Sequence, residues 1–337
     1  MCRKIVKYLV LIIAIYLWLQ AYSPFVYQEI GGKLGLFPDD YRYGDLYRLS
    51  SLPQFKEQAH ECQHPRQDLK KPIHLYLIGD SFTEDPKMKL EDFPVEKYQY
   101  VHWAKHANYQ LDMTKRNILI LETVERTFKD HFSQIADNFS NQKLVNPNLS
   151  LGKKIAQKTT EIEKIIVPDG TEERLTHTLF NYDFFLWFRE LKATLNLDIF
   201  GRTEDEVVLS KDKQNIFYAD EADVNNSKSA FYNVNDADID LFVKNINDTR
   251  NKYLALGFEG IYLSIIPNKV SIISPDLGNY NYLIKRIEGH KLLQTPFIDT
   301  YTIFKKSPQK YYLKSDTHWT CEGRAVWLQK VNSILAK

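Results

Sequence analysis

The chain alternates between short apolar runs and longer amphipathic stretches over most of its length. Short β-prone runs bounded by turn residues indicate buried strands, and they lie at residues 73–78, 117–122, 260–266 and 295–299. Apolar positions at helical spacing predict helices over residues 96–113, 236–256, 280–287 and 322–335. Strands that alternate with helices predict an α/β fold with a doubly wound, three-layer parallel sheet.

The middle of the chain interrupts this alternation. Residues 128–235 contain turn-rich spacers, with helices expected near 151–166 and 179–194 and strands near 206–209 and 215–218. We interpret this stretch as an inserted cap region on the α/β core. The predicted organisation is therefore an N-terminal segment at 1–24, a connector at 25–70 and an α/β domain at 71–337 with the insertion at about 128–235.

The first 24 residues differ in composition from the rest. An uncharged apolar run from Tyr8 to Tyr22 follows Arg3, Lys4 and Lys7. Counted from Ile5, this run matches the short end of the ~17–25 residues that cross a bilayer. The positive flank predicts a single-pass transmembrane helix with a cytoplasmic N-terminus and an exported body, in a bacterial periplasm or cell envelope. A cleaved signal peptide is the alternative, although no clear A-x-A site follows.

Charge and cysteine content narrow the class of protein. The formal net charge of +1 offers no electrostatic basis for binding nucleic acid. Cys62 and Cys321 would share an oxidising compartment after export, so either a disulfide or two buried thiols is consistent with the sequence.

One formal metal motif is present in the connector. Residues 60–64 read H-E-C-Q-H and match the H-E-x-x-H pattern of zinc proteases. Pro65 follows the second histidine, and the flanking residues are polar, whereas that chemistry needs a helix packed in a core. We therefore expect no metal site here and no cofactor elsewhere.

The candidate chemistry lies at the two ends of the body. The predicted strand at 73–78 leads into Gly79-Asp80-Ser81, where Gly79 permits a sharp turn and Ser81 follows the carboxyl end of a strand. Serine needs a base, and Asp316-Thr317-His318 supplies an imidazole and an acid to orient it. The alternative is that Ser81 is a turn residue and that Asp316 and His318 belong to a helix-capping loop.

These two segments resemble known motifs. Gly79-Asp80-Ser81-Phe82 is similar to the serine block of the SGNH/GDSL hydrolases, and Asp316-Thr317-His318-Trp319 is similar to their C-terminal block. The D-x-H-W form resembles the alginate O-acetylation proteins and related polysaccharide acetyltransferases, as do residues 122–126 and 266–269. In the alginate proteins the D-x-H block precedes the serine block, whereas this chain has the order of ordinary SGNH enzymes. The Gly-x-Asn-Asp block that supplies oxyanion donors in ordinary SGNH enzymes is not recognisable in this chain.

The resemblance implies a function and a set of site residues. It implies an acyl-serine enzyme that acetylates hydroxyls of a cell-surface or exported polysaccharide, with a membrane-bound O-acyltransferase as the donor partner. An acetylesterase with the same triad and a noncatalytic scaffold of a polysaccharide export machine are the alternatives. Candidate oxyanion donors are the Ser81 N–H and Asn268, which could instead be a plain turn residue. Arg126 and Trp319 are candidate substrate-binding residues, although Trp319 could equally pack in the core.

Overall fold

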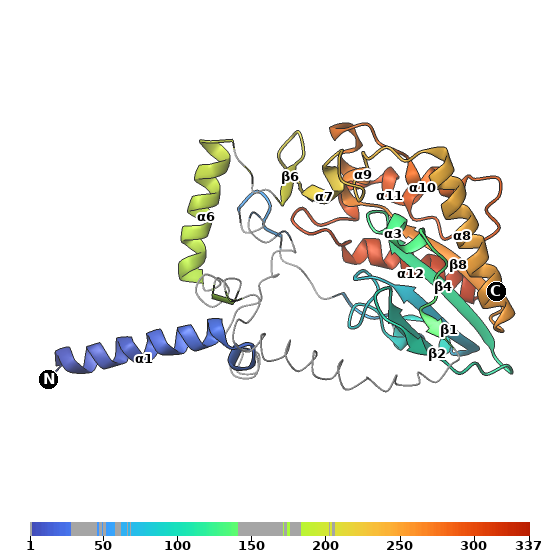
Figure 1. The fold of residues 1–337 in the computed structure, drawn as a ribbon, viewed down its shortest axis with the longest axis horizontal. Coiled ribbons are helices and arrows are strands. Elements are labelled where there is room, and N and C mark those ends of the chain that lie inside the picture. The colour runs from blue at the N-terminus through green and yellow to red at the C-terminus, as the bar shows by residue number, and fades with distance from the viewer. Residues whose placement is uncertain are drawn as a thin grey trace, which may run out of the picture.

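The computed structural model describes most of the α/β body and the N-terminal helix (Figure 1). It describes residues 2–27, 52–57, 62–140 and 183–337, apart from 66, 68, 202, 204 and 205, together with 46, 49, 171, 174 and 175. The predicted helix at 151–166 and residues His60 and Glu61 of the H-E-C-Q-H stretch lie outside the described residues.

Four parallel strands form the central sheet. They are β1 (Lys71–Gly79), β2 (Val95–His102), β4 (Arg116–Val124) and β8 (Gly260–Ile266), in the order β2-β1-β4-β8. From β1 the chain first adds a strand on one side and then returns to add β4 and β8 on the other. This reversal makes the carboxyl ends of β1 and β4 the topological switch point, which is where open α/β sheets bind ligands.

The remaining elements surround this sheet. They are α1 (Cys2–Tyr22), η2 (Leu90–Asp92), β3 (Ala107–Asn108), α3 (Phe128–Phe132), β5 (Phe139–Ser140), α6 (Asp183–Asp198), β6 (Val207–Leu209), β7 (Ile216–Tyr218), α7 (Ala219–Ala222), α8 (Asp236–Ala255), α9 (Lys269–Ile273), η3 (Pro275–Leu277), α10 (Leu283–Glu288), α11 (Tyr301–Lys306), η4 (Pro308–Lys310) and α12 (Cys321–Leu335).

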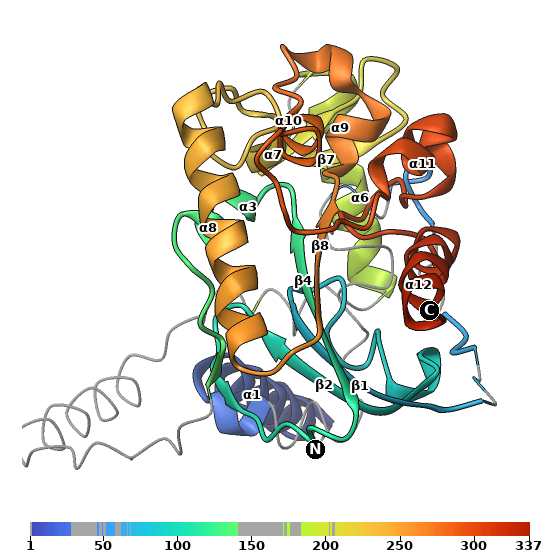
Figure 2. The same cartoon turned by 90° about the vertical axis from the view of Figure 1, so that its right-hand side faces the viewer.

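Helices lie on both faces of the sheet, with α8 on one side and α12 on the other (Figure 2). The predicted apolar side of α8 is confirmed, because Ile239, Phe242, Ile246 and Tyr253 are buried. On the opposite face, the indole N–H of Trp327 in α12 donates to Ser264 Oγ of β8 at 2.9 Å. The protein is thus a mixed α/β protein built on a parallel sheet.

The predicted helix at residues 96–113 is wrong. The structure forms the edge strand β2 at Val95–His102 and the short strand β3 at Ala107–Asn108 instead. Tyr98 and Val101 have helical spacing, but the segment is rich in β-prone Tyr and Val, and β1 has an edge that needs a partner. Pairing along β1 from Lys71 to Gly79 satisfies the backbone groups of both strands, and this tertiary gain outweighs a local pattern.

The predicted strand at 295–299 is reduced to a single parallel bridge beside β8. Phe297 pairs with Leu263, whose N–H donates to Pro296 O while its carbonyl accepts from Ile298 N. Pro296 has no N–H to extend the ladder, so the pairing stops after one bridge.

A smaller hydrophobic core joins the inserted cap region to the connector. Leu197 of α6, Val207 of β6 and Ile216 of β7 pack with four buried connector residues, Leu46, Leu49, Leu52 and Phe55. The predicted strands at 206–209 and 215–218 appear as the antiparallel pair β6–β7. The helix expected at 179–194 appears as α6, with bounds Asp183–Asp198.

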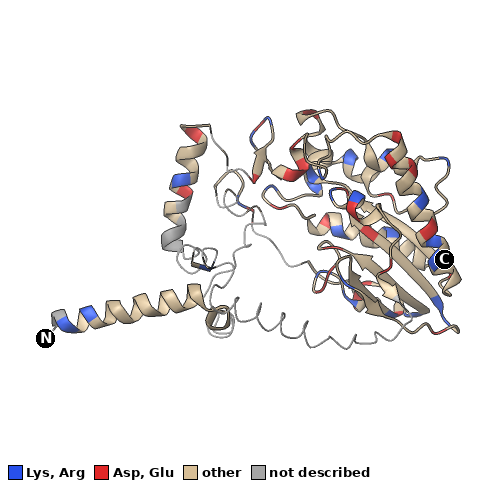
Figure 3. Cartoon of the chain, in the orientation of Figure 1, with Lys and Arg blue, Asp and Glu red and all other residues tan. Residues whose placement is uncertain are grey.

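The N-terminal helix α1 is long and apolar enough to cross a membrane, over Lys4–Tyr22. Figure 3 shows that its charged residues gather at its N-terminal end, where Lys4 and Lys7 lie. The helix extends away from the α/β body and has little of its surface buried, as expected for a segment whose partner is lipid.

Cys62 and Cys321 form a disulfide, with their Cα atoms 5.3 Å apart and a sequence separation of 259. The bond fastens the connector to the first turn of α12. Of the two states that the sequence allows, a disulfide or two buried thiols, the structure contains the disulfide.

Replacing Cys62 and Cys321 together by serine should lower the free energy of unfolding by about 3 kcal/mol, because the bond restricts a very long loop of the unfolded chain. Denaturant unfolding of the full chain in detergent measures the change, with Cys2→Ser as the matched control. Equal unfolding midpoints for the double variant and the control would contradict this prediction.

Candidate active site

Ser81 lies at a tight corner just past the end of β1. Gly79 is required there, because a Cβ atom would lie 2.2 Å from Thr83 Oγ1 and 2.7 Å from Glu122 Oε2. The Asp80 carboxylate then joins the corner to β4, accepting Phe82 N–H at 3.0 Å and Val124 N–H at 2.9 Å. Asp80 thus has a structural role at this corner, which is independent of any chemistry of Ser81.

Glu122 supports the corner from below. β4 continues to Val124, and the side chain of Glu122 within it is fully buried. Its carboxyl accepts the Asp80 N–H at 3.0 Å and the Thr83 hydroxyl at 2.7 Å. Burial, together with the nearby Asp80 carboxylate, raises the pKa of Glu122 well above its usual range.

The structure brings together the three residues of the predicted triad. Ser81 Oγ lies 3.0 Å from His318 Nε2, and His318 Nδ1 lies 2.8 Å from Asp316 Oδ1. Asp316 Oδ1 also accepts the His318 backbone N–H at 2.7 Å, which fixes the short loop between the two residues. The imidazole therefore has its Nε2 directed at the serine and its Nδ1 directed at an acid, as a general base requires.

Asp316 is held in its ionised state. Burial alone would raise its pKa, but the hydrogen bonds and the charge of His318 outweigh burial and lower the pKa to about 2. Lys269 contributes in the same direction from the start of α9. Its buried ammonium donates to Ile216 O, Lys314 O and Asp316 O, so it ties the cap hairpin to the loop that carries the triad acid.

Lys87 is a site residue that the sequence analysis missed. Its Nζ lies 3.2 Å from His318 Nε2 and donates to the backbone carbonyl of Ser81. Glu84 is its ion-pair partner at 3.6 Å, and Arg324 Nε holds the Lys87 carbonyl at 2.9 Å. The linear sequence contains no signal for this role, because Lys87 stands in a polar turn that resembles any solvated loop.

Asn268 is buried just past the carboxyl end of β8, where its side-chain oxygen and its backbone N–H form hydrogen bonds. Its Oδ1 accepts the Arg126 N–H at 3.0 Å, and its own N–H donates to Glu125 Oε2 at 2.9 Å. These bonds join the ends of β4 and β8, so the observed role of Asn268 is to close the loop between them. Its Nδ2 group is buried without a hydrogen-bond partner among the described residues, so its assignment as an oxyanion donor stays a prediction.

The two candidate substrate-binding residues have different surroundings. The Arg126 guanidinium lies 5.8 Å from the centre of the Phe82 ring and pairs with Glu221 at 2.6 Å. It is therefore next to the residue that follows Ser81. Trp319 is buried and packs edge-on against Phe82 at 5.1 Å, which leaves no open ring face for a sugar. Trp319 belongs to the hydrophobic core, which is the alternative that the sequence left open for it.

His64 of the H-E-C-Q-H stretch lies in a network of charged groups. Its Nδ1 is 2.9 Å from Asp92 Oδ2 and 3.0 Å from Arg324 Nη2, and Arg324 also pairs with Asp92 at 2.8 Å. Within the described part of the chain, no group of three His, Cys, Asp or Glu side chains is placed to hold a metal ion.

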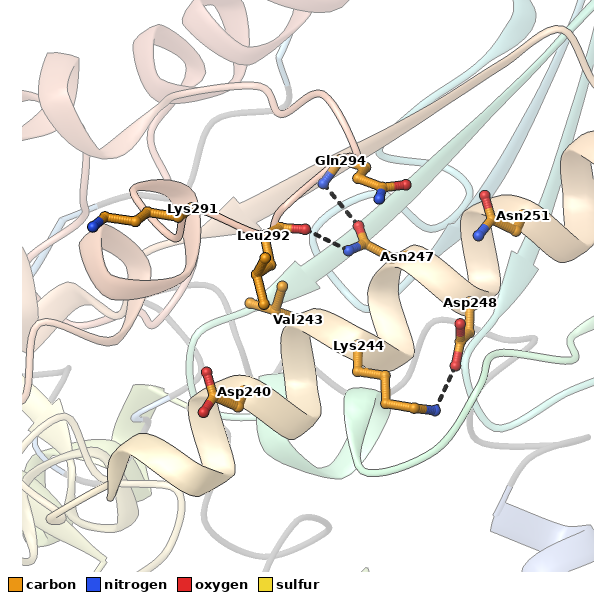
Figure 4. Close-up of a pocket in the computed structure, with 9 residues that line it drawn as sticks. All are labelled: Asp240, Val243, Lys244, Asn247, Asp248, Asn251, Lys291, Leu292 and Gln294. Carbon is orange, nitrogen blue, oxygen red and sulfur yellow. Dashed lines mark hydrogen bonds and ion pairs between the residues drawn. The ribbon is translucent and has the colours of Figure 1, made fainter.

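Two surface hollows occur away from the triad. One, of about 390 Å³, lies between α8 and residues 291–294, and in it Asn247 bonds Leu292 O and Gln294 N (Figure 4). The other, of about 630 Å³, lies beside the Cys62–Cys321 disulfide. Neither of these two hollows is lined by Ser81 or His318, so the candidate site is defined by the triad and by its place at the strand ends.

Comparisons with known proteins add no further information on this site. No family model, curated protein or solved structure matches the chain.

Glu125 provides a test of this end of the sheet that does not depend on activity. It accepts hydrogen bonds from Ser271 Oγ at 2.6 Å, Asn268 N at 2.9 Å and Tyr280 Oη at 3.0 Å. Burial outweighs these bonds and raises its pKa to about 7 from the usual 4.5. Between these two values the folded chain binds more protons than the unfolded chain, so stability falls as the pH rises through this range.

We expect Glu125→Gln to remove about 2 kcal/mol of the pH dependence of unfolding between pH 5 and pH 8. Urea unfolding at both pH values measures this difference, with the exposed Glu259→Gln as control. The prediction fails if the Gln variant keeps the full pH dependence of the wild type.

Proposed function

We propose that the protein is a membrane-anchored serine acyltransferase of the SGNH hydrolase-like class, which moves an acetyl group to hydroxyls of a cell-surface or exported polysaccharide. The observation that carries the proposal is the Ser81–His318–Asp316 hydrogen-bonded chain at the carboxyl ends of β1 and β4. The GDSF and D-x-H-W resemblance, the sheet order and the helices on both faces support it.

The proposed reaction has two steps that use the same base. His318 Nε2 takes the Ser81 proton while Oγ bonds to the acyl carbon, and the leaving group departs with that proton. An acceptor hydroxyl then loses its proton to His318 and attacks the acyl-serine, which releases Ser81 with the proton returned to Oγ. Asp316 remains ionised throughout and stabilises the imidazolium.

The Ser81 N–H is the best-supported oxyanion donor. At this corner the N–H groups of Asp80, Phe82 and Thr83 donate to Glu122, Asp80 Oδ1 and Asp80 O respectively. Their engagement leaves the Ser81 N–H for the developing negative charge. The Lys87 ammonium, next to Ser81 O and His318 Nε2, adds positive charge on the same side of the serine.

The acceptor distinguishes a transferase from an esterase. A sugar hydroxyl makes the enzyme an O-acetyltransferase, and water makes it an acetylesterase. The apolar helix α1 and the D-x-H-W resemblance favour the transferase, with a membrane-bound O-acyltransferase as the source of the acyl group. A noncatalytic scaffold in polysaccharide export is the competing class.

Acylation of the purified full chain in detergent by an activated acetyl ester tests the proposal. The wild type should give a burst and an acetyl adduct on Ser81, and Ser81→Ala should give neither. Asp316→Asn should slow acylation by about 10²–10⁴-fold, because the imidazole loses its orienting acid. Ser333→Ala, at an exposed serine of α12, is the matched control.

Absence of both adduct and turnover in the wild type would favour the scaffold. A polysaccharide fragment added to the acylated enzyme then separates the remaining classes. Acetyl recovered on the fragment indicates a transferase, and acetate alone indicates an esterase.

The charges around His318 predict opposite pH shifts for two neutralising variants. Lys87→Met removes a positive charge beside Nε2, so the acid limb of the acylation rate should move to higher pH by roughly one unit. Glu84→Gln leaves the Lys87 charge unbalanced and should move the limb to lower pH. Profiles of the acylation rate between about pH 4 and pH 8 measure both shifts. Shifts in the same direction would exclude this role for Lys87.

A further inference from the structure

Helix α6 presents a row of large apolar side chains to the outside. Trp187, Leu191 and Leu195 are 56, 42 and 41% exposed, and Ile199, one residue past the end of the helix, is 66% exposed. Successive members are four residues apart, so they occupy one continuous side of the helix. We call these four residues the outer row. Contiguous exposed apolar surface of this kind marks an interaction site rather than a solvated face.

The opposite side of α6 is already occupied. Leu197 is buried in the smaller core with Phe55 of the connector and Ile216 of β7, and Ala193 packs against the same cluster. The body of the protein therefore covers the inner side of the helix. The outer row faces away from the body, and the described residues leave it uncovered.

The position of α6 relative to α1 indicates what covers the outer row. Arg174 Nε donates to Ala21 O at 2.8 Å, so the segment that precedes α6 contacts the last turn of α1. At the same end of α1, Trp18 and Tyr22 stack with their ring centres 5.0 Å apart, and such aromatic pairs are typical of a membrane–water interface. The chain thus reaches α6 from the level at which α1 would leave the membrane.

The direction of α6 fits the same surface. In Figures 1 and 2, α6 runs across the direction of α1 rather than along it. A helix that lies across a spanning helix, at its exit, lies in the plane of the membrane. Lys192 is exposed beside the outer row, where its ammonium can reach lipid phosphates while its stem lies on the apolar surface.

We propose that α6 is an interfacial helix whose outer row inserts into the lipid bilayer that α1 crosses. The proposal goes beyond the acyl-transfer chemistry and rests only on the anchoring part of the proposed function. The docked helix would act as a second attachment that stops the body from rotating about α1.

This attachment is connected to the triad by packed contacts. The core that holds α6 includes Ile216 of β7, whose N–H donates to Lys314 O at 3.0 Å. Lys269 then links Ile216 O to Asp316 O. A bilayer-bound α6 would therefore hold the Asp316 loop at a constant height above the membrane.

Depth-dependent fluorescence quenching in vesicles tests the proposal. The full chain carries Cys2→Ser, which leaves the disulfide intact, and a single new cysteine labelled with an environment-sensitive dye at Ile12, Leu191, Leu195 or Asn251. Vesicles contain phosphatidylcholine and phosphatidylglycerol, with nitroxide groups on the acyl chains as quenchers. Asn251 is exposed on α8, in the body, and serves as the control outside the membrane.

Quenching at positions 12, 191 and 195, with none at 251, is the expected result. Quenching at 12 without quenching at 191 and 195 would overturn the proposal and assign the outer row to a protein partner. If position 12 is not quenched either, the anchor itself fails, and the docked helix fails with it. None of these outcomes depends on Ser81 acylation, so the enzymatic proposal stands or falls separately.

Discussion

The rest of the site depends on how the end of β1 is joined to the end of β4. The Asp80 carboxylate bonds Phe82 N–H and Val124 N–H, and the buried Glu122 carboxyl bonds the Asp80 N–H from the other strand. These bonds cross between the two strands at which the sheet order reverses. They satisfy buried polar groups in a place where each unsatisfied group would cost about 1–3 kcal/mol. The corner is rigid because its alternatives leave those groups unpaired.

The far end of the chain is held against this corner from several sides. His318 contacts Ser81, Lys269 bonds the carbonyl of Asp316, and Arg324 bonds the carbonyl of Lys87. The disulfide at Cys321 fastens the start of the same helix to the connector. A loop fixed in this way can keep an imidazole within hydrogen-bond distance of a serine without substrate, and such preorganisation suits the acyl transfer that we propose.

Local sequence patterns correctly predicted the strands that are buried in the sheet and the helices that pack one apolar side against it. The strands at β1, β4 and β8 and the helices α8 and α12 follow from continuous apolar runs and from helical periodicity, because burial selects the same residues in any packed arrangement. The segment at Val95–His102 was mistaken for a helix because its apolar spacing fits both structures. Only the open edge of β1 decides between them.

Ser81, Asp316 and His318 were found from the sequence because their chemistry needs particular residue types in recognisable short blocks. The sequence by itself determined the α/β alternation, the apolar N-terminal helix and the identity of these three residues. Only the tertiary structure decided the disulfide, the packing of Trp319, the contacts of Asn268 and the place of Lys87 beside His318. The physical reason is that each of these depends on a distance between segments far apart in the chain, and no local pattern records such a distance.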